Sequence, residues 1–166
     1  MIQKKVCMVG VFATGKTSLV RQFVEARFSD KYLSTVGVKI DRKPVRVGQE
    51  DVNLLLWDVE GRDAVADIQV SYLRGAAGLL YVVDGTRRET LEQIYELRAI
   101  AEQANGPLPA AVAINKSDLT DQWRVTAADE AGLRALDWKV FTTSARSGVG
   151  VENAFTWLAT RMLEAK

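Results

Sequence analysis

A short glycine-containing stretch, Gly10–Thr17, constrains the fold more than any other part of the chain. It reads G-V-F-A-T-G-K-T and lies between an apolar run, Lys5–Val9, and an amphipathic run, Lys16–Ala26. Glycines let the backbone curl so that successive N–H groups point at one anion, and a helix that begins there adds its N-terminal dipole. A chance glycine-rich turn does not account for four fixed positions in this context. The stretch therefore predicts a strand, a phosphate-binding loop and a helix in succession.

Apolar and amphipathic runs alternate along the whole chain. Strands are predicted at Lys5–Val9, Val38–Val47, Val52–Trp57, Gly78–Val83, Ala110–Ile114 and Trp138–Thr142. Helices are predicted at Lys16–Ala26, from a capping box at Thr86 to Ala101, at Thr126–Ala135, and after Gly150, where Val151, Phe155, Leu158 and Met162 form one apolar face. The turn Gly48–Asp51 makes the second and third strands an antiparallel hairpin, and Pro44 suits an edge strand. The alternation predicts one α/β domain over residues 1–166, with a mostly parallel sheet.

The composition excludes several classes of protein. With 166 residues, 48% of them hydrophobic, the chain is long enough for one core, and its net charge of +1 gives no support for nucleic-acid or membrane binding. The absence of histidine excludes histidine bases and histidine-ligated zinc. A single cysteine, Cys7 in an apolar run, excludes disulfides and favours a cytoplasmic location. The last residues hold no cysteine, so we expect no lipid anchor. Four arginines are interpreted as solvated: Arg42, Arg46, Arg87 and Arg88.

The phosphate loop also brings charge and a metal ligand. Lys16 is placed to reach the β- and γ-phosphates of a nucleotide, and the hydroxyl of Thr17 to bind Mg²⁺. Phe12 is large for a loop that surrounds a phosphate. It either crowds the terminal phosphate or folds away onto apolar neighbours, and the sequence leaves both alternatives open.

A second motif, Asn115-Lys116-Ser117-Asp118, follows the predicted strand Ala110–Ile114. The carboxylate of Asp118 can accept hydrogen bonds from both the ring N–H and the exocyclic amine of guanine. Adenine offers no such pair of donors and leaves a buried carboxylate unpaired, which discriminates strongly between the bases. Ser144-Ala145 follows the last strand, and the backbone N–H of Ala145 is a candidate donor to the guanine carbonyl. Together the two motifs predict a guanine nucleotide.

With these motifs the chain resembles the Ras-like small GTPases, and most closely the Rab-type members. The resemblance covers essentially the whole chain. It rests on Gly10–Thr17, Thr35-Val36-Gly37-Val38, Trp57-Asp58-Val59-Glu60-Gly61, Asn115–Asp118, Thr143-Ser144-Ala145, and the Rab-like Tyr72–Gly78 with Val82-Val83-Asp84. The resemblance implies a six-stranded, mostly parallel sheet with one antiparallel edge strand, flanked by about five helices. It also implies a molecular switch that binds and hydrolyses GTP.

The resemblance implies a set of site residues. Nucleotide contacts fall on Gly10, Ala13, Thr14, Gly15, Lys16, Thr17, Ser18, Phe28, Thr35, Asp58, Gly61, Asn115, Lys116, Asp118, Ser144, Ala145 and Arg146. Mg²⁺ ligands fall on Thr17, Thr35 and, through water, Asp58, and catalytic roles on Lys16, Thr35, Gly61 and Arg62. The γ-phosphate and Mg²⁺ are expected to order Thr35 and Gly61, and hydrolysis to release them. Protein partners are expected to bind near residues 30–41 and 62–74.

Three residues depart from the family pattern around the terminal phosphate. Arg62 stands where the family usually has a glutamine that orients the attacking water, and arginine has no acceptor for that water. It is either a solvated residue or a stabiliser of transition-state charge. Glu60 replaces a small residue and is either repelled outward or paired with Arg62 or Lys16. With Phe12, these departures predict tight guanine-nucleotide binding and slow hydrolysis.

Two other functions remain open at this stage. One is a binding module locked on GTP, in which hydrolysis is lost. The other is a phosphotransferase that prefers ATP and acts on a small acceptor, although N-K-x-D and Thr35 argue against it.

Overall fold

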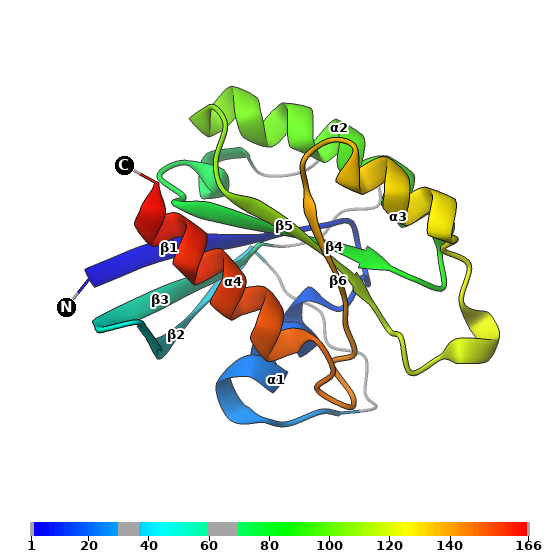
Figure 1. Ribbon diagram of the computed structural model, residues 1–166, viewed down its shortest axis with the longest axis horizontal. Coiled ribbons are helices and arrows are strands. Elements are labelled where there is room, and N and C mark those ends of the chain that lie inside the picture. The colour runs from blue at the N-terminus through cyan, green and yellow to red at the C-terminus, as the bar shows by residue number, and fades with distance from the viewer. Residues whose placement is uncertain (1, 30–36, 60–69, 166) are drawn as a thin grey trace.

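Six strands form one sheet in the order β2-β3-β1-β4-β5-β6 (Figure 1). The structure is a computed structural model that describes residues 2–29, 37–59 and 70–165. The strands are β1 (Ile2–Val9), β2 (Val38–Val47), β3 (Glu50–Val59), β4 (Gly78–Asp84), β5 (Ala110–Asn115) and β6 (Lys139–Thr142). Every neighbouring pair is parallel except β2 with β3. The predicted fold class, a mostly parallel sheet with one antiparallel edge strand, is confirmed.

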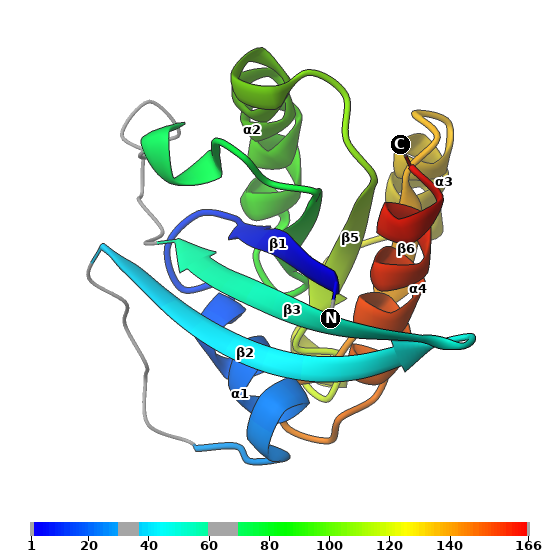
Figure 2. The ribbon, with the colours of Figure 1, turned by 90° about the vertical axis from the view of Figure 1, so that its left-hand side faces the viewer.

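The hairpin of β2 and β3 forms one edge of the sheet (Figure 2). Its strands pair from Val38 with Val59 to Val47 with Glu50, and Gly48 has a positive φ of 61° in the turn between them. Pro44 lies in the outermost strand, where its missing N–H removes no hydrogen bond from the interior of the sheet. The predicted hairpin and its edge position are both present.

Four α-helices lie on the two faces of the sheet among the described residues. They are α1 (Lys16–Glu25), α2 (Arg88–Asn105), α3 (Ala127–Arg134) and α4 (Val151–Glu164), with two 3-10 helices at Val70–Leu73 and Thr120–Gln122. Helices α2 and α3 cover one face, and α1 and α4 the other (Figure 1). In these parts of the chain, no helix has both the length and the apolar character needed to cross a membrane.

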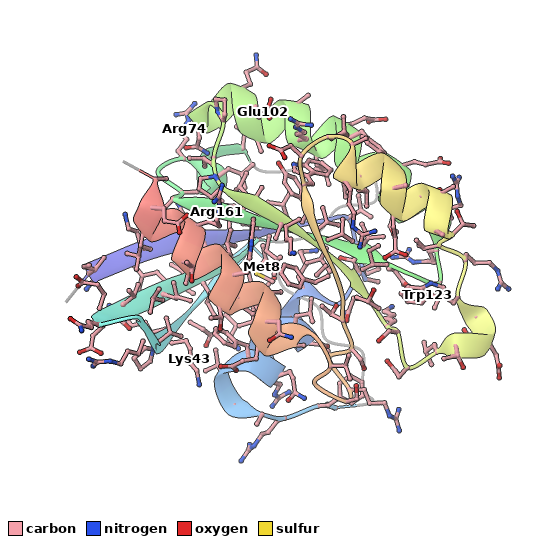
Figure 3. The ribbon with its side chains drawn as sticks, viewed as in Figure 1. Met8, Lys43, Arg74, Glu102, Trp123 and Arg161 are labelled. Atoms are coloured by element: carbon pink, nitrogen blue, oxygen red, sulfur yellow. The ribbon has the colours of Figure 1, made fainter. Side chains whose placement is uncertain are left out.

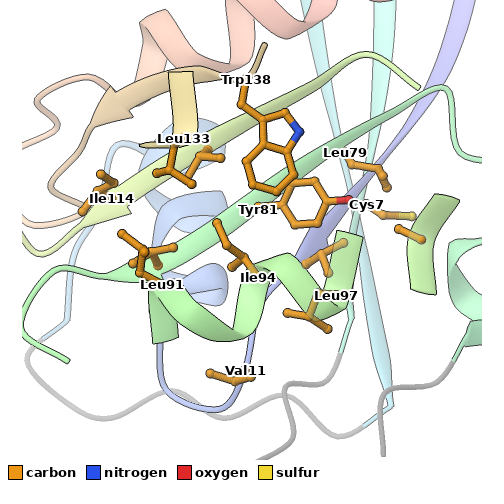
Figure 4. Packing of buried hydrophobic residues seen from close by; sticks show 14 of the residues in the cluster. Cys7, Val11, Leu79, Tyr81, Leu91, Ile94, Leu97, Ile114, Leu133 and Trp138 are labelled. Carbon is orange, nitrogen blue, oxygen red and sulfur yellow. The ribbon is translucent and has the colours of Figure 1, made fainter. Parts of the chain in front are cut away.

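Each face of the sheet has its own apolar core, because side chains alternate along a strand. In β1, Cys7 and Val9 enter the core under α2 and α3, whereas Val6 and Met8 enter the core under α1 and α4. Figure 4 shows the first core, where Tyr81 lies against Trp138 with ring centroids 5.0 Å apart. Cys7 is buried in this core, and the burial raises the pKa of its thiol to about 11.

The second core contains the apolar face predicted for the last helix. Val151, Phe155, Leu158 and Met162 are all buried there. The Phe155 ring stacks on Phe23 of α1 with centroids 4.2 Å apart, which holds α1 and α4 together below the sheet. Because α1 begins directly after the phosphate loop, this contact also fixes the helix that follows the loop.

The two predicted helix caps have different outcomes. Thr126 caps α3 in a capping box with Asp129, as predicted. Thr86 does not cap α2, which begins at Arg88 with Arg87 at the N-cap position. The prediction was wrong because the Thr86 hydroxyl donates instead to Asp84 Oδ1 at 2.6 Å. The acceptor is a buried carboxylate at the end of β4, and it takes the hydroxyl that would otherwise bond to the N–H groups of the first helical turn.

Candidate nucleotide-binding site

The polar motifs meet at the carboxyl ends of the parallel strands, the edge at which ligands bind in open α/β sheets. Gly10 follows β1, Asp58 lies near the end of β3, Asp84 ends β4, Asn115 ends β5 and Thr143 follows β6. Figure 3 shows Trp123 near this end of the sheet, whereas Arg74 and Glu102 lie at the opposite end. The strand order therefore brings together residues that are more than a hundred positions apart in the sequence.

The two glycines of the phosphate loop lie where neighbouring atoms leave no room for a side chain. A Cβ atom at Gly10 would lie 2.6 Å from the carbonyl oxygen of Val82. Gly15 has φ of 98°, and a Cβ there would collide with the side chain of Asn115. Between them Ala13 adopts a left-handed conformation, with φ of 62°, which is uncommon for a residue with a side chain. The loop therefore needs contacts from outside to hold this shape.

Three successive carbonyl groups of the loop accept hydrogen bonds from side chains on other elements. The pairs are Arg87 Nη2 with the Phe12 oxygen at 2.6 Å, Lys116 Nζ with the Ala13 oxygen at 3.0 Å, and Asn115 Nδ2 with the Thr14 oxygen at 3.2 Å. In a trans peptide the N–H points opposite to the C=O, and no described peptide bond is cis. The N–H groups of Ala13, Thr14 and Gly15 therefore point away from these three donors, which is the orientation that an anion-binding loop requires.

Lys16 lies within the loop and is almost fully buried. Its ammonium group donates to the carbonyl oxygens of Gly10 and Val11, both at 3.1 Å. Burial lowers the pKa of Lys16 to about 8, with Asp58 acting to raise it and Arg87 to lower it. An anion beside this group favours its charged form, so the loop presents a desolvated cation that suits a phosphate.

Thr17 and Asp58 supply oxygen ligands of the kind that Mg²⁺ binds. The Thr17 hydroxyl donates to Asp58 Oδ2 at 2.5 Å, so the two groups lie side by side at the start of α1 and near the end of β3. Hard oxygen donors from a hydroxyl and a carboxylate fit this ion. Thr17 and Asp58 would hold Mg²⁺, which would supply positive charge that stabilises a bound phosphate.

Ser144 and Asn115 organise the predicted base-binding side. The buried Ser144 hydroxyl donates to Asp118 Oδ1 at 2.8 Å and fixes that carboxylate. Asn115 Oδ1 accepts from the Thr143 hydroxyl at 3.2 Å and from the Ala145 N–H at 3.3 Å. The sequence assigns this N–H to a guanine carbonyl, whereas here it donates to Asn115. A base would have to share or replace this long hydrogen bond.

Phe28 and Arg146 contact each other, and Arg146 directly follows Ala145 of the base-binding motif. The guanidinium carbon of Arg146 is 5.7 Å from the centroid of the Phe28 ring. Phe28 is 40% exposed and belongs to neither of the two apolar cores. Ser18 is half-buried in the first turn of α1, one residue after Thr17.

Asp84 lies among the site residues, although the sequence motif Val82-Val83-Asp84 was assigned no role in the site. Its buried carboxylate accepts from Lys116 Nζ at 2.8 Å and from Arg87 Nε at 3.1 Å. Burial alone would raise the pKa of Asp84, but hydrogen bonds from Lys116 and Thr86 outweigh it and hold the pKa below its usual value. The available signal was its position, an acidic residue directly after a fully apolar strand. The interpretation of Arg87 as a solvated arginine was wrong, because its Nε and Nη2 are both hydrogen-bonded to the site.

Of the predicted catalytic residues, Thr35, Gly61 and Arg62 lie outside the described parts of the chain. Glu60, one of the departures from the family pattern, also lies outside them. Phe12 is described, is 41% exposed, and enters neither of the two cores.

Comparison with known proteins agrees with this geometry. A family model described as the Ras family matches residues 5–164. The chain belongs to the Ras family. It is 32% identical over 166 residues to Ras-related protein Rab-8A of Bos taurus, covering 98% of this chain and 79% of that protein. It is 34% identical over 159 residues to Ras-related protein Rab-1 of Theileria annulata, covering 93% and 72%, and 31% identical over 162 residues to Ras-related protein Rab-13 of Rattus norvegicus, covering 96% and 79%. This Ras family member is a Rab-type small GTPase, a GTP-binding molecular switch.

The contacts of Asn115 predict how strongly it holds the nucleotide. Asn115→Ala removes three hydrogen bonds, to Thr14, Thr143 and Ala145, so the dissociation of a fluorescent guanine nucleotide is expected to be about a hundredfold faster, at about 1 kcal/mol per bond. Thr143→Val removes one of the three and is expected to cost at most about tenfold. The exposed Asn153 on α4 provides the control, Asn153→Ala. Equal rates for Asn115→Ala and Asn153→Ala would contradict the assigned role.

Proposed function

We propose that this Ras family member binds guanine nucleotide tightly with Mg²⁺ and hydrolyses GTP slowly. One observation carries the binding part of the proposal. Asn115 and Lys116 of the base motif donate directly to the carbonyls of Thr14 and Ala13 in the phosphate loop. Base recognition and phosphate binding therefore share one set of hydrogen bonds, which suits a ligand that has both parts, a nucleotide rather than a free phosphate.

Guanine fits the base side best. The carboxylate of Asp118 has one oxygen fixed by Ser144, and as an anion it remains an acceptor for two donors on one edge of a base. Guanine presents such a pair, a ring N–H beside an exocyclic amine, whereas adenine does not. An ATP-dependent phosphotransferase is disfavoured for the same reason.

Replacing the carboxylate by an amide should change the base preference. In Asp118→Asn the side chain has one acceptor and one donor, so it matches xanthine, which has a carbonyl where guanine has its amine. We expect affinity for GDP to fall by at least about a hundredfold and the variant to prefer xanthosine diphosphate, measured by competition against a fluorescent nucleotide. The control is Asp121→Asn, at an exposed aspartate nearby. An unchanged preference in Asp118→Asn would contradict guanine recognition by this residue.

Slow hydrolysis is supported by the groups around the terminal phosphate. Lys16 provides a buried positive charge, and Thr17 with Asp58 provides the metal ligands. These groups stabilise charge on the transferring phosphoryl group, but none of them orients the attacking water. Arg62 occupies the position of the usual glutamine and has no acceptor, and the bulky Phe12 lies in the loop with much of its surface exposed.

The hydrolysis proposal is tested by single-turnover measurement on the GTP-loaded protein. Arg62→Gln is expected to raise the rate by about tenfold or more, since one added acceptor for the water corresponds to about 1.4 kcal/mol in the barrier. Arg161→Gln, on α4, is the control for loss of an arginine. A fast wild-type rate without an activator contradicts slow hydrolysis, and undetectable turnover in every variant favours a module locked on GTP.

We also propose that protein partners bind near residues 30–41 and 62–74, within the cytoplasm. Ile40 supports the first surface, since it is 49% exposed and pairs in register with the half-exposed Trp57. The ammonium group of Lys5 lies 3.5 Å from the centroid of the Trp57 ring. Exposed apolar groups bordered by charge are typical of protein interfaces.

The exposed isoleucine predicts the effect of a charge on partner binding. Ile40→Asp is expected to abolish capture of those proteins that bind the GTP-loaded form and not the GDP-loaded form, while nucleotide retention is unchanged. Ile2→Asp, an exposed isoleucine in the first residues of β1, is the matched control. If the Ile40→Asp variant still captures these proteins, the partner surface does not include Ile40.

A further inference from the structure

Arg87 connects the end of β4 to the phosphate loop. Its Nε donates to Asp84 Oδ2 at 3.1 Å, and its Nη2 donates to the carbonyl oxygen of Phe12 at 2.6 Å. The side chain is 37% exposed, so it lies at the surface, yet two of its guanidinium nitrogens are hydrogen-bonded to the site. A planar guanidinium that holds two acceptors at once has a fixed position, unlike a freely solvated arginine.

The Phe12 carbonyl belongs to the same peptide group as the N–H of Ala13. When a side chain holds the oxygen on the outer side of the loop, the N–H is held toward the anion site, and a charged donor on the oxygen polarises the N–H. Ala13 has a left-handed φ of 62°, a conformation that persists only where neighbouring contacts fix it. Arg87 fixes the peptide before Ala13, and Lys116 fixes the peptide after it.

The anchor for both donors is the same oxygen atom. Asp84 Oδ2 accepts from Arg87 Nε and from Lys116 Nζ, so one buried carboxylate positions both cations. The residue after Asp84, Gly85, packs closely against Trp123, since a Cβ atom at Gly85 would collide with the Trp123 ring. The N–H of Arg124 donates to the Gly85 oxygen at 2.8 Å. Arg87 therefore acts on the loop from a rigid support.

We propose that Arg87 is a positioning residue for the nucleotide. It sets the Phe12–Ala13 peptide so that the Ala13 N–H faces the phosphates, and it thereby lengthens the residence time of the bound nucleotide. The proposal rests on the proposed function, guanine-nucleotide binding. It assigns to Arg87 no contact with the nucleotide itself, since its bonded atoms hold the outer side of the loop.

The test compares Arg87→Ala and Arg87→Lys with Arg88→Ala. Arg88 is the adjacent arginine, and it pairs with Glu92 and Asp129 away from the loop. Dissociation of fluorescent GDP is expected to be about three- to tenfold faster in Arg87→Ala, the range for one partly exposed charged hydrogen bond. Arg87→Lys is expected to fall between Arg87→Ala and wild type, because one ammonium group replaces a fork. Arg88→Ala is expected to match wild type.

A spectroscopic measurement separates positioning of the loop from a general loss of stability. In ¹⁵N-labelled protein bound to GDP, the Ala13 amide proton is expected to shift upfield in Arg87→Ala and to remain in place in Arg88→Ala. An unmoved Ala13 signal with unchanged dissociation would overturn the role of Arg87 and leave the proposed function intact. A wild-type chain that retains no guanine nucleotide would instead contradict the proposed function.

Discussion

The orientation of three peptide groups in the phosphate loop is the constraint on which the site depends. A loop can bind phosphate only if its N–H groups face inward, and a trans peptide achieves this when its carbonyl is held outside. The carbonyls of Phe12, Ala13 and Thr14 are each held by a side chain from beyond the loop. Those side chains lie at or just after the ends of β4 and β5, so the sheet order β1-β4-β5 is what brings the donors to the loop.

This arrangement makes the base motif and the phosphate loop one unit. Asn115 bonds to Thr14 on one side and accepts from Thr143 and Ala145 on the other, so it joins the ends of β1, β5 and β6. The base motif and the loop peptides are therefore joined by direct hydrogen bonds through one side chain.

The sequence predicted the sheet and the motifs well because both depend on local pattern. Buried parallel strands consist of continuous apolar residues, and the phosphate loop requires particular residue types at fixed spacing. The partners of side chains were harder to predict. Thr86 has the spacing of a helix cap, yet it bonds to Asp84, and Arg87 looks like any surface arginine until its carbonyl partner at Phe12 is known. The first bond joins residues two positions apart, and the cap pattern does not distinguish it from a helix cap. The second depends on the pairing of β1 with β4, which local pattern does not encode.

The support of the loop by distant side chains has a consequence for transplantation of the motif. An octapeptide copied from Gly10–Thr17 into a foreign scaffold would keep its glycines, Lys16 and Thr17, but it would leave behind Asn115, Lys116 and Arg87. Its peptides would be free to rotate, and any phosphate would have to order them on binding, at about 1–2 kcal/mol for each residue fixed. The transferable part of this site is therefore the loop together with the strand ends that carry its supporting side chains, and not a string of eight amino acids.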